Sequence, residues 1–311
     1  MTDPAPHIAP TSFNHKFVTT CGYKYHYVEE GDPKGEPLLL VHGFPDLWYG
    51  WRHQIKYLAK LGYRVIAVDC LGYGQTDSPM ELQEFGMKSV CTHLAGVLDA
   101  LDIPKVTIIG HDWGGALVWR FGLYYPERLH GIISICTPFN PPATKFRTLE
   151  EIVKVVPEFE YQLNFANPAT TAKMDAKVDD VLGNILRMGN MHEQASGILV
   201  DVEYMCSQYK HSGFRGPLNY YKTTKVNFDD ERGVVGKTID MPCWIIMAKD
   251  DPFLKPHMAQ KMKDFMPGLK STMIEAGHFV MTEKPDETND KLKECLDDLA
   301  QRRSGQSKAS L

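Results

Sequence analysis

The chain has 311 residues, of which 43% are apolar and 23% charged, a composition typical of a globular protein with a sizeable core. A formal net charge of -5 without a basic block argues against nucleic acid as the main partner. No apolar run approaches the roughly 18–20 residues that span a bilayer, so we expect no membrane association.

Strands and helices alternate along the first part of the chain. Residues 17–20 and 23–28 flank Gly22 and predict a β-hairpin. Largely apolar runs, which predict strands covered on both faces, occur at 38–41, 64–68, 106–109 and 132–135. Apolar residues at helical spacing separate them, at 51–58, 90–101 and 116–125. This alternation predicts an α/β fold, a mainly parallel sheet with helices on both faces.

The alternation stops at about residue 138 and resumes at about residue 236. Between these points the sequence has helical patches and turns but no strand pattern. The later elements are a strand at 244–247, a helix at 258–265, a strand at 271–274 and a terminal helix with Leu292, Leu296 and Leu299. We therefore predict one α/β core, residues 1–137 and 236–311, and a helical insertion, residues 138–235.

A glycine-rich segment, residues 110–115 (GHDWGG), lies where a buried strand meets a helix. This is the setting of the Gly-x-nucleophile-x-Gly elbow, with Asp112 in place of the usual serine. Small residues flank the nucleophile because the turn is strained and a Cβ would crowd the neighbouring backbone. A phosphate-binding glycine loop, or a helix N-cap by Asp112, would explain part of the same pattern.

An aspartate nucleophile restricts the chemistry. Its carboxylate is ionised at neutral pH and attacks carbon directly. Attack on an acyl carbon would give an anhydride, whereas attack on a saturated carbon with a leaving group gives an alkyl ester that water can open. The expected substrate is therefore a small-molecule electrophile, either an epoxide or an alkyl halide.

The partners of the nucleophile are expected after the last strands, because such elbows are followed along the chain by an acid and then a histidine. His278 follows the final strand, in residues 275–279 (EAGHF). The acid lies in residues 248–252 (AKDDP), where Asp251 matches a Gly-x-x-Asp-Pro pattern and Asp250 is the alternative. His278 would deprotonate a water molecule, and the acid would fix its tautomer.

Charge develops on the carbonyl oxygen of Asp112 when water attacks the ester. We expect two backbone N–H groups to receive it, those of Trp113 and of Phe44, in residues 42–45 (HGFP). A cis peptide bond before Pro45 would aim the Phe44 N–H inward. The same four residues are also compatible with a simple tight turn at the end of a strand.

These segments resemble the soluble epoxide hydrolases of the α/β-hydrolase superfamily. Residues 42–52 (HGFPDLWYGWR) look like the first signature of that family, and residues 110–115 like the second. The resemblance implies an α/β-hydrolase fold in which residues 138–235 form a helical cap. It also implies two cap tyrosines that grip the epoxide oxygen: Tyr161, in the segment FEYQLNF, and Tyr221 rather than Tyr220, in the segment GFRGPLNYY.

The resemblance implies conversion of an epoxide to a vicinal diol, because two phenol O–H groups can polarise the ring oxygen and then supply a proton. We expect the substrate pocket to include His42, Pro45, Trp113, Phe165 and Phe279. No cofactor is expected, and no metal, because no set of histidines and carboxylates has metal-ligand spacing.

Other functions fit the sequence less well. A haloalkane dehalogenase shares the aspartate elbow, but it commonly has a donor side chain after the His-Gly pair, where this chain has Phe44. A non-catalytic ligand-binding relative would have a degraded triad, whereas every catalytic position here is filled. An esterase requires serine or cysteine at position 112.

Cysteine usage and the termini bear on the cellular compartment. The seven cysteines are widely spaced and match neither a disulfide framework nor a zinc pattern, so we predict reduced thiols in a cytoplasmic protein. Residues 1–6 (MTDPAP) lack the features of a signal peptide. Residues 309–311 (ASL) lack the basic middle residue of the peroxisomal Ser-Lys-Leu address. We expect a monomer or a homodimer.

Overall fold

The computed structural model describes residues 8–188 and 198–309, which contain one eight-stranded sheet. The strands are β1 (His15–Thr20), β2 (Tyr23–Gly31), β3 (Pro37–Val41), β4 (Arg64–Val68), β5 (Val106–His111), β6 (Leu129–Ile135), β7 (Cys243–Ala248) and β8 (Leu269–Ile274). Their spatial order is β1-β2-β4-β3-β5-β6-β7-β8. Pairs β1–β2 and β2–β4 are antiparallel and the others parallel, which confirms the predicted hairpin and the mainly parallel sheet.

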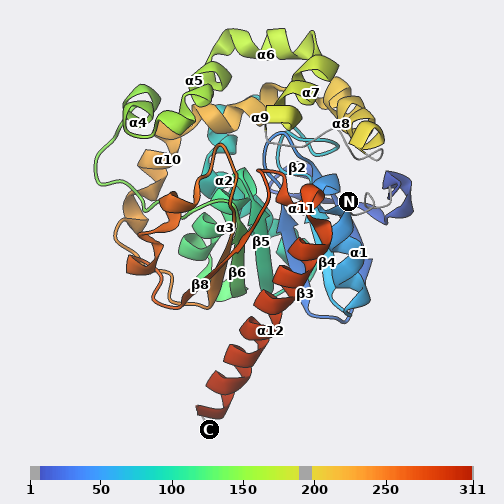
Figure 1. The fold of residues 1–311 in the computed structure, drawn as a ribbon, viewed down its shortest axis with the longest axis vertical. Coiled ribbons are helices and arrows are strands. Elements are labelled where there is room, and N and C mark those ends of the chain that lie inside the picture. The colour runs from blue at the N-terminus through green and yellow to red at the C-terminus, as the bar shows by residue number, and fades with distance from the viewer. Residues whose placement is uncertain (1–7, 189–197, 310–311) are drawn as a thin grey trace.

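Helices cover both faces of the sheet (Figure 1). On one face α1 (Arg52–Lys60) contacts α12 (Pro285–Ala309), and on the other α2 (Met87–Ala100) contacts α3 (Trp113–Tyr124). Right-handed crossovers explain why the helices lie on opposite faces. The connection from β3 to β4 runs one way along the sheet, and the connections from β4 to β5 and from β5 to β6 run the other way. Strands β5 and β7, covered on both sides, are buried at every position.

The described residues between β6 and β7 form helices and turns but no strand, in agreement with the sequence pattern. The helices are α4 (Leu149–Val155), α5 (Tyr161–Ala166), α6 (Pro168–Asp175), α7 (Val178–Met188), α8 (Ile198–Ser212), α9 (Arg215–Asn219) and α10 (Thr224–Asp230). Helices α4 to α9 arch across the carboxyl end of the sheet (Figure 1), and α10 contacts α2. The short helix α11 (Val280–Glu283) follows β8.

The predicted helix at 258–265 is wrong. That part of the chain forms two separate 3₁₀ turns, Pro256–Ala259 and Met262–Asp264. Met262 and Met266 are buried, but Met258 is only partly buried. Apolar residues that recur every three or four positions do not distinguish an α-helix from successive 3₁₀ turns, which join residues three apart.

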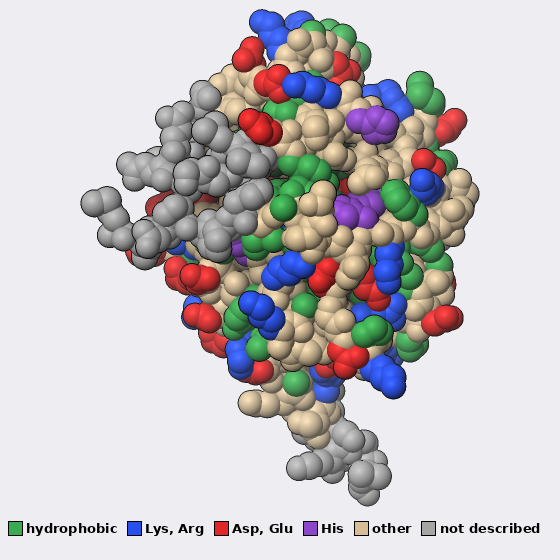
Figure 2. Space-filling model, turned by 90° about the vertical axis from the view of Figure 1, so that its right-hand side faces the viewer, with side chains coloured by type: hydrophobic (Ala, Val, Ile, Leu, Met, Phe, Trp, Pro, Cys, Tyr) green, Lys and Arg blue, Asp and Glu red, His purple; other side chains and the backbone are tan. Residues whose placement is uncertain are grey.

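The outer surface offers few leads to function. On the face shown in Figure 2, basic and acidic side chains are interspersed rather than gathered by sign. Within the part of the chain that the structure describes, no helix is both long and apolar enough to cross a bilayer. All seven cysteines are free thiols, and six of them are buried. The reactive side chains gather instead at the carboxyl edge of the sheet, beneath the helices of the insertion.

Candidate active site

Asp112 occupies the sharp turn between β5 and α3. Its backbone angles are φ 52° and ψ -120°, a strained conformation for a residue with a Cβ. Close packing holds the turn: a Cβ on Gly114 would lie 2.0 Å from the carbonyl oxygen of Val41, and one on Gly110 would lie 2.2 Å from that of Gly114. The turn therefore has the tight packing that the elbow motif predicted.

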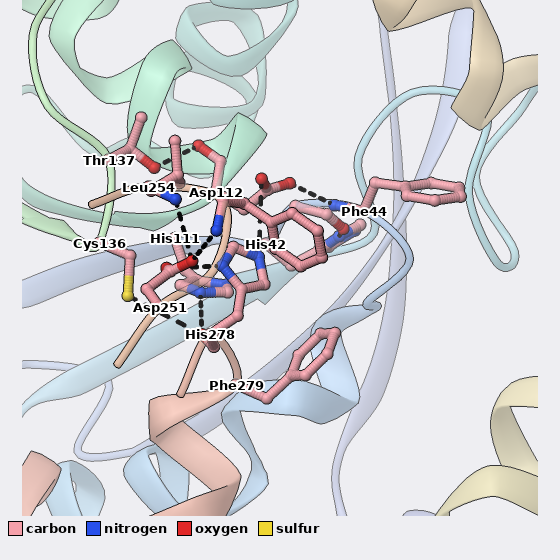
Figure 3. A network of polar contacts seen from close by, with 12 residues as sticks. His42, Phe44, His111, Asp112, Cys136, Thr137, Asp251, Leu254, His278 and Phe279 are labelled. Carbon is pink, nitrogen blue, oxygen red and sulfur yellow. Dashed lines mark hydrogen bonds and ion pairs between the residues drawn. The ribbon is translucent and has the colours of Figure 1, made fainter. Parts of the chain in front are cut away.

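A backbone N–H group holds one oxygen of the Asp112 carboxylate (Figure 3). The Phe44 N–H donates to Oδ1 at 2.7 Å. The peptide bond between Phe44 and Pro45 is cis, as expected. The other oxygen, Oδ2, lies 3.7 Å from Nε2 of His278. One carboxylate oxygen is thus fixed by the core, and the other faces the histidine.

His278 and Asp251 form a buried ion pair beside Asp112 (Figure 3). His278 Nδ1 lies 2.8 Å from Oδ2 of Asp251, whose Oδ1 accepts hydrogen bonds from the N–H groups of Phe253 and Leu254 at 2.8 and 2.9 Å. Asp250, the alternative acid, is exposed. The structure therefore brings Asp251 to the histidine, whose Nε2 edge remains turned toward the nucleophile.

Burial and mutual charge shift the pKa values of these three groups. Burial lowers the pKa of His278, but the Asp251 and Asp112 carboxylates outweigh it and raise the pKa to about 9. Burial raises the pKa of Asp251, but His278 and the hydrogen bonds that the carboxylate accepts lower it to about 2. Burial also raises the pKa of Asp112, against the effects of His278 and of the Phe44 and Trp113 N–H groups. The two carboxylates therefore favour the protonated form of His278, and His278 favours the ionised form of Asp251.

Two side chains that sequence analysis missed approach the carbonyl oxygen of His278. His111 Nε2 donates to that oxygen at 2.8 Å, and the thiol of Cys136 lies 3.8 Å from it. Burial lowers the pKa of His111 to about 3, so its ring is neutral. His111 stands next to the nucleophile in the sequence, but its partner lies 167 residues away, and no sequence signal links the two.

Asp46 is a further carboxylate near the site that sequence analysis did not single out. Its side chain is buried, and burial raises its pKa to about 6 in spite of the Leu47 N–H bond and the charges of Arg52 and His278. A Cβ on Gly50 would lie 1.8 Å from Oδ2 of Asp46, so this glycine makes room for the carboxylate. Asp46 therefore changes charge close to the physiological pH range.

The two tyrosines singled out by the resemblance lie together above Asp112. Tyr161 begins α5, Tyr221 lies in the 3₁₀ turn Tyr220–Lys222, and their ring centroids are 6.3 Å apart. The Tyr221 ring is 5.1 Å from that of Trp113. Burial is the largest cause that raises the pKa of both phenols, and the charge of Asp112 adds to it. Both phenols therefore keep their protons at neutral pH and can act as donors.

Phe165 and Phe279 border this group. The Phe165 ring packs 5.2 Å from that of Phe44 and 5.0 Å from that of Tyr221, so it joins the insertion to the core. The Phe279 ring lies 5.1 Å from that of His278 (Figure 3). The walls beside the nucleophile are thus largely aromatic.

His42 and Pro45 are both buried. His42 Nδ1 donates to the carbonyl of Gly43, and its Nε2 accepts from the N–H of Cys70, both at 2.9 Å. Neither ring nitrogen is therefore available to a ligand. Among the residues described, no group of three or more His, Cys, Asp or Glu side chains is arranged to hold a metal ion.

Fold and site together define an α/β-hydrolase whose sharp turn between β5 and α3 carries Asp112. The family model described as alpha/beta hydrolase fold matches residues 36–285. An epoxide hydrolase of Neurospora crassa is 32% identical over 331 residues, which cover 94% of this chain and 97% of that protein. Bifunctional epoxide hydrolase 2 of Rattus norvegicus is 36% identical over 307 residues, 90% of this chain but 55% of that protein. The chain thus spans about half the length of the bifunctional relatives it matches.

Solved structures agree with these relatives. An epoxide hydrolase of Vigna radiata has a TM-score of 0.84 at 25% identity, over 93% of this chain and 99% of that one. Epoxide hydrolase A of Mycobacterium thermoresistibile has a TM-score of 0.83 at 27% identity, over 92% and 98%. The chain therefore belongs to the α/β-hydrolase superfamily and, within it, to the soluble epoxide hydrolases, as the sequence resemblance implied.

Proposed function

We propose that this chain hydrolyses an epoxide to a vicinal diol through a covalent ester on Asp112. The observation that carries the proposal is the unequal environment of the two carboxylate oxygens. Oδ1 accepts the Phe44 N–H at 2.7 Å, whereas Oδ2 lies on the side of His278, 3.7 Å from its Nε2. Oδ2 is the oxygen that attacks, and Oδ1 becomes the carbonyl oxygen of the ester.

Ring opening uses the insertion. Oδ2 of Asp112 forms a bond to one epoxide carbon while the bond from that carbon to the ring oxygen breaks. Tyr161 and Tyr221 donate to the leaving oxygen, and one of them gives it a proton. Phenols with raised pKa values are weak acids, but the acceptor is an alkoxide, which is a much stronger base. Residues 138–235 act as the cap that holds both phenols over the nucleophile.

Ester hydrolysis uses the core. Water attacks the carbonyl carbon of the Asp112 ester and loses a proton to Nε2 of His278, while Asp251 stabilises the imidazolium. The N–H groups of Phe44 and Trp113 hold the charge that develops on Oδ1. The ester bond then breaks, and the departing alkoxide takes the proton from His278. The proton left on the carboxyl group returns to the phenolate formed in the first step.

The residues around Asp112 favour an epoxide over an alkyl halide. Tyr161 and Tyr221 lie together near Asp112 and can polarise and protonate the oxygen of an opening ring, which a departing halide does not need. Phe44, at the position where haloalkane dehalogenases commonly have a donor side chain, supplies none.

The first test is a paired turnover assay with styrene oxide, scored for diol, and 1-bromobutane, scored for bromide. We expect diol without bromide. Bromide without diol would leave the aspartate chemistry standing but contradict the role of the tyrosines.

The His278→Gln variant should accumulate the ester, visible as a substrate-sized mass increase on the intact protein, with turnover reduced about 10²- to 10⁴-fold. Continued substrate consumption without an adduct would contradict the two-step scheme.

A further inference from the structure

The segment that carries Tyr221 is bound to the core by an arginine. From α9, Arg215 Nη1 donates to the carbonyl of Pro79 at 2.5 Å, and Nη2 donates to the carbonyl and the hydroxyl of Ser78 at 2.7 and 3.0 Å. Ser78 and Pro79 belong to the core loop after β4. A planar guanidinium can serve several acceptors at once and stays charged at every accessible pH.

Two further contacts join the same segments. The Tyr220 hydroxyl donates to the carbonyl of Leu71 at 3.1 Å. The backbones of Gly216 and Gly72 touch, since a Cβ on Gly216 would lie 2.6 Å from the Cα of Gly72. Arg215, Gly216 and Tyr220 thus form three attachments within the six residues that precede Tyr221, and we call them the Arg215 clamp.

The core side of the clamp is itself tied to the sheet. The Thr76 hydroxyl donates to the carbonyl of Asp69 at 2.8 Å and accepts from the N–H of His26, in β2, at 2.9 Å. Asp77 and Lys24 exchange hydrogen bonds: the Asp77 N–H donates to the Lys24 carbonyl at 2.9 Å, and the Lys24 N–H donates to the Asp77 carboxylate at 2.8 Å. The loop is therefore a fixed point from which the clamp can position Tyr221.

Tyr161 is supported differently. Its ring packs against those of Phe165, Tyr221 and Phe253, with centroids 5.6, 6.3 and 5.2 Å away, and its hydroxyl accepts one long hydrogen bond, 3.4 Å, from the adjacent Gln162 side chain. The ion pair near it, Glu158 with Lys255, has an N···O distance of 3.2 Å, and both side chains are partly exposed. Apolar ring contacts define an orientation less strictly than hydrogen bonds to backbone carbonyls do.

We propose that Arg215 is a positioning residue for ring opening: its bonds to Ser78 and Pro79 set the place of the Tyr221 hydroxyl over Asp112. Arg215 touches neither substrate nor nucleophile and acts only through Tyr221. The inference rests on the proposed function, because it assigns Arg215 to the alkylation step and not to ester hydrolysis.

The test measures alkylation alone, in a His278→Gln background where the ester persists. Adduct formation with styrene oxide is followed by intact-protein mass after mixing in single turnover. Arg215→Lys keeps the positive charge but loses the planar guanidinium that donates to two residues at once. We expect alkylation to slow by about 10- to 100-fold, as for a misplaced catalytic group. When His278 is intact, Arg215→Lys should change the rate at which the ester decays by less than about twofold, since the clamp does not contact the core half of the site.

Two controls separate positioning from general damage. Arg128→Lys removes a comparable pair of guanidinium hydrogen bonds, since Arg128 donates to the carbonyls of Pro104 and Ile103 at 2.8 and 2.9 Å. This change should leave alkylation unchanged. In a Tyr221→Phe background, Arg215→Lys should add no further slowing, because the hydroxyl that it positions is already absent. Ser78→Ala, a milder change, should slow alkylation about two- to fivefold, again only when Tyr221 is present.

The outcomes are distinct. Equal slowing with and without the Tyr221 hydroxyl, equal slowing by Arg128→Lys, or unchanged alkylation in both Arg215→Lys and Ser78→Ala would overturn the positioning role while the proposed function stands. Absence of any adduct in the His278→Gln parent would overturn the proposed function and this inference with it.

Discussion

The two halves of the candidate site are held by different forces. In the core half, Asp112, Asp251 and His278 are fixed by hydrogen bonds of 2.7–2.9 Å, many of them to backbone groups. In the lid half, the ring of Tyr161 packs against three other aromatic rings, and Tyr221 depends on a clamp several residues away.

This difference matches the demands of the two chemical steps that we propose. Ester hydrolysis needs a water, a base and two N–H donors in one fixed geometry, which a hydrogen-bonded network on the sheet edge supplies. Ring opening brings the substrate itself into the lid half, where the walls are aromatic and adapt more readily than polar networks do. The comparison implies that mutations can separate the two steps.

Removal of the nucleophile should have the largest effect, because both halves act on Asp112. We expect Asp112→Asn to lower diol formation by about 10⁴-fold or more, without any covalent adduct. Asp112→Ala serves as the control, since an alanine cannot regain the carboxylate by deamidation. Turnover at the wild-type rate in both variants would contradict the proposed mechanism outright.

The lid phenols should have the next largest effect, confined to alkylation. A hydrogen bond to a developing charge contributes about 1.5–3 kcal/mol, so Tyr161→Phe and Tyr221→Phe should each slow adduct formation about 10- to 150-fold. Tyr221→Phe should be the more severe, because the clamp holds its hydroxyl in place. The double variant should nearly stop adduct formation in single-turnover mass measurements; full activity there would remove both tyrosines from the mechanism.

The pH dependence of the two steps should differ as well. The charge of Asp112 is one of the causes that raise the pKa of His278 to about 9, so esterification of Asp112 lowers that pKa below 9. His278 acts as a base only when neutral, so ester decay should slow about tenfold per pH unit below its pKa and level off above it. Alkylation depends on protonated phenols and should stay nearly flat from about pH 6 to 9. Quenched single-turnover reactions measure both rates, and an ester decay that falls with rising pH would contradict His278 as the base.

The core half was largely predictable from the sequence. Asp112 was identified because it follows an apolar run that had to be a buried strand, and His278 because it follows the last predicted strand; parallel strands end at one edge of the sheet. The choice between Asp251 and Asp250 needed coordinates, because adjacent residues in a loop can face opposite ways. Only the structure shows that Asp251 faces the ring.

The lid half was predictable only through resemblance. Nothing in the spacing of 14 tyrosines distinguishes Tyr161 and Tyr221, since burial and hydrogen bonding explain most tyrosines. The clamp could not be predicted from the sequence. Arg215 donates to the backbone carbonyls of Ser78 and Pro79, and every residue type has such a carbonyl, so the residue types at 78 and 79 give no sign of the contact. The false helix at 258–265 has a similar origin, because periodicity records which residues are buried and not how the backbone turns between them.

The smallest expected effect tests whether ring packing, and not the nearby ion pair of Glu158 with Lys255, holds Tyr161. Lys255→Gln breaks the ion pair with Glu158, but both side chains are partly exposed, and such pairs contribute little. We expect adduct formation to change by less than about twofold. Phe253→Leu removes a ring 5.2 Å from that of Tyr161 and should slow the same step severalfold, since the phenol then has more than one orientation. If Lys255→Gln instead slowed alkylation as much as Arg215→Lys does, Tyr161 would also be placed by a polar anchor, and the contrast between the two lid tyrosines would be wrong.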